Sequence, residues 1–535
     1  MPSASLHARG VSRAYGANQV LDAVDLTVAV GDRIGLVGAN GAGKTTLLRV
    51  LGGIEVADTG WVRCVPPGAT VGYLPQEPER TTETLRDFLR RRAGVAAAER
   101  ALEQSAAALG RVGAEDAYSD ALDRYLALGG PDLDARIGAV CDDLALPVAT
   151  LNLEMAALSG GQAARASLAS LLLSRFDVFL LDEPTNDLDL AGLDRLERWV
   201  LSLEAGLVVV SHDRAFLERT VTSVLELDDV SHQATLYNGG WLAYREARAV
   251  ARRHAEEAFE EYRGRRTELE TRARAQRQWA NTGAKKLTKK PKDNDKAQRD
   301  FFLNRTEKQA SKVRITEKAL DRLEVVDKPF EKWELQFSIA AAARSGEVVR
   351  LRNAVVERGH FRLGPLDFEI GWAERVGILG PNGSGKTTLL DVILGRLAPT
   401  SGERWFGPGV VVGEIGQRRQ RFLSDASLLD EFSAAAGVLV RDARSLLAKF
   451  GLSAEHVGRP ASTLSPGERT RAELALLMAK GVNCLVLDEP TNHLDLAAIE
   501  ELERALGLWD GTLLLVTHDR RLLEAVELTR SIELG

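Results

Sequence analysis

One series of short motifs occurs twice in this chain in the same order, and this repetition constrains the fold more than any other feature. Each copy contains a glycine-rich loop ending in Lys-Thr, a glutamine, a segment beginning Leu-Ser, an apolar run ending in Asp-Glu, and a His-Asp pair. The first copy comprises Gly38–Thr45, Gln76, Leu158–Gln162, Asp177–Glu183 and Ser211–Asp213. The second comprises Gly380–Thr387, Gln417, Leu464–Glu468, Asn483–Glu489 and Thr517–Asp519. One such loop is weak evidence, whereas the ordered repetition predicts two nucleotide sites.

Length and composition agree with two large domains. The chain has 535 residues, of which 45% are hydrophobic and 27% are charged, as in ordinary globular proteins. No apolar run approaches the roughly 18–20 residues that span a bilayer, and residues 1–5 do not resemble a signal peptide. We therefore expect a cytoplasmic protein without a membrane partner. Cys64, Cys141 and Cys484 are far apart and lack CxxC spacing, so neither a disulfide nor a zinc site is expected.

The spacing of the motifs shows where the two copies differ. The P-loop lysines lie 342 residues apart, whereas the other motifs, except the glutamine, recur after 306. The interval from the glutamine to the following Leu-Ser serine is 83 residues in the first copy and 48 in the second. About 35 residues are therefore inserted, and the Ala-rich stretch 95–128, interrupted near Gly110 and Gly113, predicts a helical hairpin arm. The predicted domains are 1–240 (arm about 88–140), a linker at 241–328, and 329–535.

The residue types in each copy suit phosphate transfer. Backbone N–H groups of the glycine-rich loop are expected to surround the phosphates, with the lysine supplying charge and the threonine a hydroxyl for Mg²⁺. The Asp-Glu pair follows an apolar strand, so it lies at the carboxyl edge of a parallel sheet. We expect the aspartate to hold Mg²⁺, the glutamate to polarise water and the histidine to reach the γ-phosphate. These residues are Lys44, Thr45, Asp182, Glu183 and His212, and Lys386, Thr387, Asp488, Glu489 and His518.

Nearly the whole chain resembles the ABC-F group of the ATP-binding-cassette superfamily. The resemblance is carried by the signature segments Leu158–Gln162 and Leu464–Glu468, by the blocks 183–186 and 489–495, and by the linker. It implies an α/β fold with two P-loop NTPase cassettes, each with a helical signature subdomain, plus an α-helical arm and an α-helical hairpin linker. It also implies an ATPase, a monomer whose cassettes close head to tail, so that each P-loop faces the opposite signature.

The resemblance extends to individual site residues. The implied ATP-binding residues are Tyr15, Gly38, Asn40, Gly41, Gly43, Lys44, Thr45, Thr46, Gln76, Ser159, Gly160, Gly161 and Gln162, and Gly380, Asn382, Gly383, Gly385, Lys386, Thr387, Thr388, Gln417, Ser465, Gly467 and Glu468. The implied Mg²⁺ ligands are Thr45, Gln76 and Asp182 in one site and Thr387, Gln417 and Asp488 in the other. Asp189 and Asp495 match the D-loop of the family.

Departures from the family pattern predict two unequal sites. Tyr15 fits the aromatic residue that stacks on adenine, but the second copy has no tyrosine in the aligned region, where Arg358, His360 or Phe361 are the alternatives. Pro466 and Glu468 replace Gly160 and Gln162, and Asp187 replaces His493. A proline removes a backbone donor.

The linker combines two polar helical stretches, about 241–281 and 297–326, with a basic connection. Its cations are Lys285, Lys286, Lys289, Lys290, Lys292, Lys296 and Arg299. A charge run alone is more often a solvated surface. At the tip of a hairpin, beside Trp279 and Phe301-Phe302, it suits RNA phosphates and unpaired bases. The segment is similar to the family's P-site tRNA interaction motif, which implies the ribosomal E site, 23S rRNA and P-site tRNA as partners.

Within the family two roles compete. One is antibiotic resistance by ribosome protection against macrolide- or lincosamide-type drugs at the peptidyl-transferase centre or exit tunnel. The other is a general translation factor that relieves stalled ribosomes. The context of Leu464–Arg471 is similar to actinobacterial resistance members, which favours the first role. The ATPase subunit of an ABC transporter is the alternative from another class, and the basic linker argues against it.

Overall fold

The computed structural model describes residues 4–109, 114–186, 188–288, 314–316, 318, 346–359, 361–415, 421–492 and 494–534. The chain divides into two compact units, one formed by Met1–Leu242 with Glu334–Gly535 and the other by Ala243–Trp333. The first unit contains both cassettes, and the second contains most of the linker. Among the described residues, no helix is both long and apolar enough to cross a membrane.

The first cassette contains two sheets. The larger, in the order β5-β6-β7-β3-β8-β9, consists of β3 (Arg33–Val37), β5 (Val71–Leu74), β6 (Val178–Asp182), β7 (Gly206–Val210), β8 (Ser223–Leu227) and β9 (Ala234–Asn238). Its pairs are parallel except β8 with β9. The smaller antiparallel sheet, β2-β1-β4, consists of β1 (Ser5–Tyr15), β2 (Asn18–Ala29) and β4 (Thr59–Val65). Every residue of β6 and β7 is buried, which explains their continuous apolar sequences.

The second cassette repeats this plan. Its parallel sheet, β14-β15-β16-β12-β17, consists of β12 (Arg375–Leu379), β14 (Val412–Ile415), β15 (Cys484–Asp488), β16 (Thr512–Val516) and β17 (Arg530–Glu533). Its antiparallel sheet, β11-β10-β13, consists of β10 (Glu347–Arg358), β11 (Phe361–Gly371) and β13 (Ser401–Phe406). In both cassettes the strand preceding the Asp-Glu pair lies next to the strand preceding the His-Asp pair, so the two motifs meet at one sheet edge.

Helices surround these sheets in a corresponding order. The first cassette has α1 (Lys44–Leu51), α2 (Leu85–Arg92), α5 (Leu133–Asp143), α6 (Gly160–Leu173), α7 (Leu190–Ser202) and α8 (Arg214–Thr220), with 3₁₀ turns at Val148–Asn152 and Met155–Ala157. The second has α11 (Lys386–Leu394), α12 (Leu428–Ala436), α13 (Val440–Lys449), α14 (Ala454–Val457), α15 (Pro466–Ala479), α16 (Leu496–Gly507) and α17 (Arg520–Val526), with a 3₁₀ turn at Ala461–Thr463. The signature helices α6 and α15 each begin after a serine that caps the helix.

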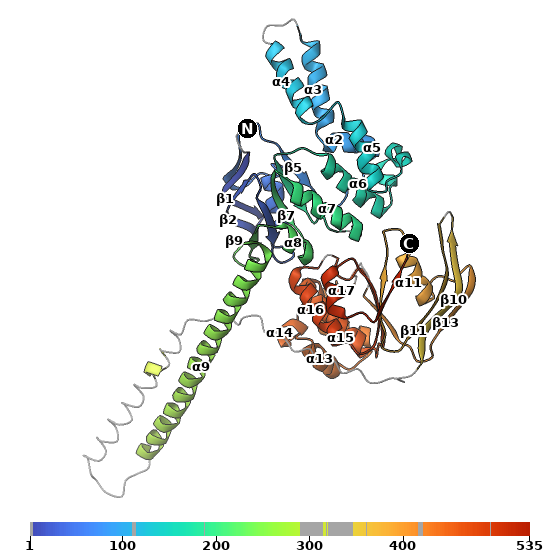
Figure 1. Cartoon of the computed structure of the whole chain (residues 1–535). Helices are drawn as coiled ribbons and strands as arrows, with labels where there is room; N and C mark the ends of the chain where they lie inside the picture. Colours follow the sequence, from blue (N-terminus) through green and yellow to red (C-terminus); the bar gives the residue numbers. More distant parts are fainter. Residues whose placement is uncertain are drawn as a thin grey trace. The chain divides into compact units, whose positions relative to one another are not determined.

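The inserted segment of the first cassette forms a helical hairpin. Its helices α3 (Val95–Ala107) and α4 (Ala114–Ala127) lie side by side (Figure 1). Val95, Ala98 and Ala114 are buried, whereas most other positions of the two helices are at least partly exposed.

The linker begins with one continuous helix, α9 (Gly240–Thr288), seen in Figure 1. It is 49 residues long, which corresponds to about 74 Å at 1.5 Å per residue. Ion pairs four residues apart, such as Arg252 with Glu256 (3.0 Å) and Arg266 with Glu270 (3.1 Å), support this exposed helix. The sequence predicted an end near Asn281. The helix continues to Thr288 because alanine, lysine and leucine between these positions are strong helix formers.

Lys285 and Lys286 therefore belong to helix α9 rather than to a loop. Lys289, Lys290, Lys292, Lys296 and Arg299 lie outside the described residues, as do Phe301 and Phe302. Of the second predicted helix, only 314–316 and 318 are described, and these residues are helical. The domain boundaries and the basic tip remain predictions.

Reciprocal ion pairs join the two cassettes. Arg214 at the start of α8 binds Glu503 of α16, with Nη1 3.0 Å from Oε2. Arg520, the equivalent residue 306 positions later, binds Glu197 of α7, with Nη1 2.7 Å from Oε1, and it also contacts Asp194. Because Glu197 and Glu503 are themselves 306 residues apart, the same contact is made in both directions across the interface.

Candidate functional site

The first P-loop has the compact geometry that a phosphate cradle requires. Gly43 has a φ of 103°, and a Cβ there would lie 2.6 Å from Val20 Cγ1, so only glycine fits. Lys44 Nζ donates hydrogen bonds to the carbonyl oxygens of Gly38 (2.9 Å) and Ala39 (3.0 Å). Burial lowers the pKa of Lys44, while nearby carboxylates oppose this shift. The loop thus holds a cation beside the N-terminus of α1, which favours anions.

The second P-loop repeats this geometry with one different neighbour. Lys386 Nζ donates to the carbonyl oxygens of Gly380 (2.8 Å) and Pro381 (3.1 Å). Gly385 has a φ of 99°, and a Cβ there would lie 2.7 Å from Phe361 Cζ. Phe361 therefore packs against the second P-loop where Val20 packs against the first.

A threonine and an aspartate meet beside each P-loop in a way that suits Mg²⁺. Thr387 Oγ1 donates to Asp488 Oδ2 at 3.1 Å, and Thr45 bonds to the Asp182 carboxylate. Burial raises the pKa of both aspartates. Mg²⁺ is usually bound by one or two carboxylates plus substrate phosphates. Among the described residues, no cluster of three or more His, Cys, Asp or Glu side chains capable of holding a metal occurs.

The two glutamates after these aspartates have left-handed backbones. The φ angles are 52° at Glu183 and 47° at Glu489, in the region that non-glycine residues rarely adopt. Each is held by its backbone N–H, which donates to the carbonyl of Val210 or Val516 at 2.9 Å. Glu183 Oε2 is buried without a hydrogen-bond partner among the described residues. The strained backbone at the same place in both cassettes, together with the incompletely satisfied carboxylate of Glu183, fits a site that orients a further polar group.

The two histidines differ in their contacts. His212 Nε2 lies 3.0 Å from Glu183 Oε1. His518 Nε2 lies 3.1 Å from Lys386 Nζ and 3.5 Å from Glu489 Oε1. Because an ammonium only donates, His518 Nε2 accepts from Lys386. Burial, followed by the Lys386 charge, lowers the pKa of His518 to about 4, so this imidazole is neutral near pH 7.

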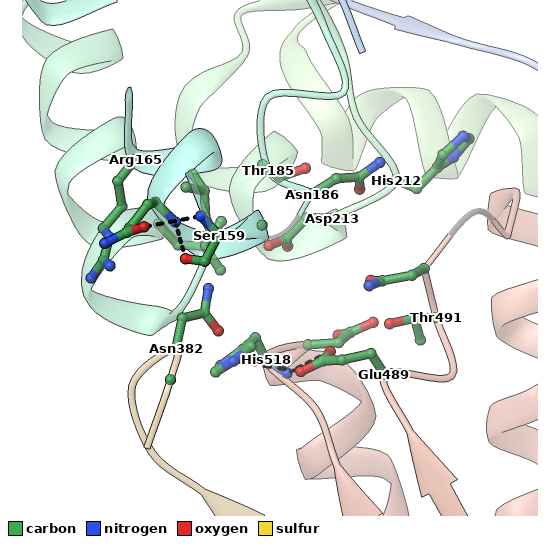
Figure 2. Close-up of a pocket in the computed structure, with 18 of the residues that line it drawn as sticks. Ser159, Arg165, Thr185, Asn186, His212, Asp213, Asn382, Glu489, Thr491 and His518 are labelled. Carbon is green, nitrogen blue, oxygen red and sulfur yellow. Dashed lines mark hydrogen bonds and ion pairs between the residues drawn. The ribbon is translucent and has the colours of Figure 1, made fainter. Parts of the chain in front are cut away.

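One cavity brings the first signature together with the second P-loop. It measures about 580 Å³, and its lining includes the signature residues of the first cassette together with Asn382, Gly383, Glu489 and His518. Figure 2 shows Ser159 and Arg165 on one side and Asn382, His518 and Glu489 on the other. The signature residues in the lining are Ser159, Gly160, Gly161 and Gln162. This composite cavity is the pairing that the family resemblance implies.

The reverse pairing is less complete. A cavity of about 460 Å³ around the first P-loop is lined only by first-cassette residues. Ser465, Gly467 and Glu468 line none of the cavities around the two P-loops. The D-loops nevertheless cross in both directions: Asp189 Oδ2 accepts from Asn382 N at 3.1 Å, and Asp495 Oδ2 accepts from Asn40 N at 3.4 Å. The two composite sites are therefore assembled to different extents.

Most of the other predicted residues lie in the cavities around the P-loops. The first cavity is lined by Tyr15, Asn40, Gly41, Gly43, Lys44, Thr45, Thr46, Gln76, Asp182, Glu183 and His212. The second, about 420 Å³, is lined by Arg358, Phe361, Asn382, Gly383, Gly385, Lys386, Thr387, Thr388, Asp488 and Glu489. Gln417, His360, Asp187 and His493 lie outside the described residues.

Two of the three alternatives for the base-contacting residue of the second cassette, Arg358 and Phe361, lie among the described residues. Tyr15 pairs with Asn18 across the β1–β2 turn, and Arg358 pairs with Phe361 across the equivalent β10–β11 turn. Arg358 thus has the register position of Tyr15. Both Arg358 and Phe361 line the second cavity.

Arg165 is a cavity residue that sequence reasoning missed. It lies on α6, one turn after Gln162, and lines the composite cavity. The signal in the sequence was a single arginine in an otherwise small and apolar helix. Thr185 and Asn186, and their counterparts Thr491 and Asn492, also line this cavity. Their Glu-Pro-Thr-Asn context was visible in the sequence, but only as a family motif.

Comparisons with known proteins agree with this geometry. The family model described as ABC transporter matches residues 21–186 and 363–492. The chain is 36% identical to the tylosin resistance ATP-binding protein TlrC of Streptomyces fradiae, over 97% of this chain and 96% of that protein. It is 32% identical to the energy-dependent translational throttle protein EttA of Escherichia coli K12, over 95% and 88%. The archaeal ribosome recycling factor aABCE1, solved with the ribosomal stalk protein aP1, shares the fold, with a TM-score of 0.56, 20% identity and coverage of 98% and 87%.

Proposed function

The chain belongs to the ABC-F group of the ATP-binding-cassette family and is an ATPase, and we propose that it uses ATP on the ribosome to protect translation from an antibiotic. The observation that carries the proposal is the composite cavity, in which the first signature faces the second P-loop within one chain. Such a cavity makes cassette closure depend on nucleotide, because a bound triphosphate touches both halves. We propose a monomer that closes on itself.

The residues around the second P-loop have separate roles in ATP hydrolysis. Lys386 and the N–H groups of its P-loop bind the phosphates, and Asn382 and Ser159 close the cavity from opposite cassettes. Glu489 orients the attacking water, while His518 senses the γ-phosphate from the next strand. Phosphoryl transfer depends mainly on such positioning and on charge stabilisation. In the first cassette, Lys44, Glu183 and His212 have the same roles.

The magnesium ion belongs beside the threonine and aspartate of each P-loop. Thr45 with Asp182, and Thr387 with Asp488, are the groups that would hold it, joined by Gln76 and Gln417 as the family implies. When bound there, Mg²⁺ would supply positive charge that stabilises the phosphates during transfer. For the adenine, Tyr15 offers a ring in the first site, and Arg358 offers a guanidinium plane in the second.

The linker is the proposed RNA-contacting element. Helix α9 begins directly after the first cassette and carries Lys285 and Lys286 near its described end. Together with Lys289, Lys290, Lys292, Lys296 and Arg299, these residues are proposed to contact phosphates of 23S rRNA or P-site tRNA from the E site. We accordingly propose a cytoplasmic, ribosome-associated protein.

The names of the similar proteins favour a role in antibiotic resistance over a general role in translation. TlrC is named for tylosin resistance and matches nearly the full length of this chain, which supports a macrolide- or lincosamide-type drug. EttA is named as a translational throttle and matches at slightly lower identity, so a general translation factor is the second candidate. A role as a transporter ATPase would instead require a membrane partner.

Drug tolerance provides the deciding measurement. The chain is expressed in a sensitive host and tested with macrolides, lincosamides, pleuromutilins and phenicols, beside the Glu183→Gln/Glu489→Gln chain, in which we expect ATP hydrolysis to be largely lost. Tolerance that needs the glutamates, together with ATP-dependent pelleting of the protein with ribosomes, is expected. Pelleting with ribosomes without tolerance to any drug would favour the translation-factor role. Pelleting with membranes instead would favour the transporter role.

Replacing the linker cations tests the proposed RNA contact. Alanine at Lys285, Lys286, Lys289, Lys290 and Lys292 should weaken ribosome pelleting and make the remaining binding less sensitive to salt, since each lost phosphate contact removes a counterion-release contribution. Replacing Trp279, Phe301 and Phe302 is the matched control, because stacking depends less on salt. Unchanged pelleting for both variants would show that the linker is only a solvated connector.

A further inference from the structure

The carboxylate of the second signature is held by a charged cluster. Glu468 lies in the first turn of α15, where its Oε2 accepts a hydrogen bond from Ser465 N at 2.8 Å. Its Oε1 lies 3.2 Å from His456 Nε2 and 3.6 Å from Arg459 Nη1. Both oxygens therefore have partners, and the carboxylate has one fixed orientation.

The first signature uses the same backbone device without charge. Gln162 Oε1 accepts from Ser159 N at 2.9 Å, as Glu468 does from its serine. The positions 306 residues before His456 and Arg459 are Thr150 and Leu153, neither of which is ionisable. Glu468, His456 and Arg459 thus occur together in the second cassette. The corresponding positions of the first cassette, Gln162, Thr150 and Leu153, are all uncharged.

The local structure dictates how His456 meets Glu468. His456 Nδ1 lies 3.1 Å from the backbone N of Ser453, which precedes α14, and 2.8 Å from its Oγ. A backbone N–H only donates, so Nδ1 accepts and the ring proton resides on Nε2. That proton points at Glu468 Oε1. The imidazole can therefore orient the carboxylate through this hydrogen bond.

Arg459 supplies the positive charge. Its Nη2 donates to the carbonyl of Thr463 at 2.7 Å, and its own carbonyl accepts from Leu428 N at 3.0 Å. These contacts fix both the backbone and the guanidinium, leaving Nη1 directed at Glu468. An arginine held in this way loses little conformational freedom when it pairs with a carboxylate.

The position of Gln162 shows why this neutralisation matters. Gln162 lines the composite cavity opposite the second P-loop. In the head-to-tail pairing proposed above, Glu468 would occupy the equivalent place opposite Lys44, where a carboxylate without compensation would repel the triphosphate. We propose that His456 and Arg459 are positioning residues that orient and neutralise Glu468, so that the second signature accepts the ATP held by the first P-loop. The proposal rests on the head-to-tail pairing proposed above.

A cycle of variants of the full chain tests this idea through steady-state ATPase kinetics without ribosomes. His456→Ala/Arg459→Gln should raise the KM for ATP by roughly five- to tenfold, with a smaller change in kcat. Combining it with Glu468→Gln should restore the KM to within about twofold, because no charge is then left to neutralise. An equal rise in KM with and without Glu468→Gln, or no rise at all, would overturn the proposal. Leu153→Gln is the matched control in the first cassette and should leave the KM unchanged.

Two further measurements separate the causes of failure. Thermal melting identifies variants whose KM rises only because the signature subdomain unfolds, and rescue by Glu468→Gln excludes that explanation independently. Lys44→Ala tests the pairing itself. If Lys44→Ala leaves the ATPase activity unchanged, the first site does not hydrolyse ATP and the proposed pairing fails. If it lowers activity while the His456/Arg459 variant does not, only the role of the cluster fails.

Discussion

The helices α6 and α15 begin with the same hydrogen-bonded turn but differ in the charge of the third helix residue. Each begins at a serine that caps the helix, and in each the third residue of the helix returns a side-chain oxygen to that serine's N–H. In α6 that residue is the neutral Gln162, and Arg165 lines the cavity one turn later. In α15 it is Glu468, and the residue equivalent to Arg165, Arg471, forms an ion pair with Glu501 at 2.7 Å.

This comparison shows how duplicated sites come to differ. Hydrogen bonds that define the signature turn are retained, because the first N–H groups of a helix need partners. The charge of the third helix residue differs between the two, and in the second cassette it is accompanied by His456 and Arg459. We therefore expect the two sites to hydrolyse ATP at different rates.

Removing both glutamates should have the largest effect. Glu183→Gln/Glu489→Gln should lower turnover by about 10²-fold or more while ATP still binds, because the amide keeps the shape but loses the carboxylate that orients water. Phosphate release and equilibrium ATP binding measure the two parts. The single variants sharpen the comparison, since the glutamate with the larger effect identifies the faster site. Parental turnover in the double variant would show that these glutamates do not serve hydrolysis.

Removing the P-loop lysines one at a time should have the second-largest effect and should show that the two sites contribute unequally to ATPase activity. Both Lys44→Ala and Lys386→Ala should lower ATPase activity, and we expect the loss to be greater for Lys386→Ala by roughly threefold or more. The reason is that Lys386 serves the site already joined to its opposite signature and also contacts His518. Equal losses in ATPase activity and drug tolerance would count against unequal sites.

Exchanging Gln162 and Glu468 between the two signatures should have a smaller effect on the KM for ATP, and the effect should differ between the two changes. Gln162→Glu places a carboxylate where no basic pair stands, so it should raise the KM for ATP by about fivefold. Glu468→Gln removes a charge that is already neutralised and should change the KM by less than about twofold. A loss of similar size from both changes would break the contrast between α6 and α15.

The stability of the fold should depend on pH through Asp213 and Asp519, the aspartates that follow the two histidines. Burial raises the pKa of Asp519 to about 6 from 3.8, and also raises that of Asp213. The folded state therefore keeps the Asp519 proton to a higher pH than the unfolded chain does. The stability that this proton contributes is lost as the pH rises from about 4 to 6, and the fold stays less stable above pH 6. The loss at Asp519 amounts to about 3 kcal/mol at most.

Asp519→Asn should therefore raise the melting temperature by a few degrees at pH 7.5 and by much less at pH 4.5. Asparagine also caps helices, so the hydrogen bonds at the start of α17 have a replacement. Melting curves at both pH values measure the difference, with Asp213→Asn as the counterpart in the first cassette. A gain of the same size at both pH values would show that the effect does not arise from ionisation.

Much of the architecture followed from sequence patterns with a local cause. The apolar runs before Asp182 and Asp488 predicted buried parallel strands, and β6 and β15 are such strands. The inserted alanine-rich stretch predicted helices, and α3 and α4 form there. The end of α9 was predicted seven residues too early, because a single glycine and several lysines resembled a loop although their helix propensities are mostly high.

The sequence by itself determined where the two glycine-rich loops and the strand ends with acidic pairs lie, because glycine spacing, helix N-termini and strand ends are properties of short segments. It also determined that the two signatures differ in charge. Only the tertiary structure decided that Phe361 lies below Gly385, that His518 accepts from Lys386, and that His456 directs a proton at Glu468. These contacts join residues distant along the chain or on separate elements. Their distances depend on how sheets, helices and cassettes pack, which no local pattern encodes.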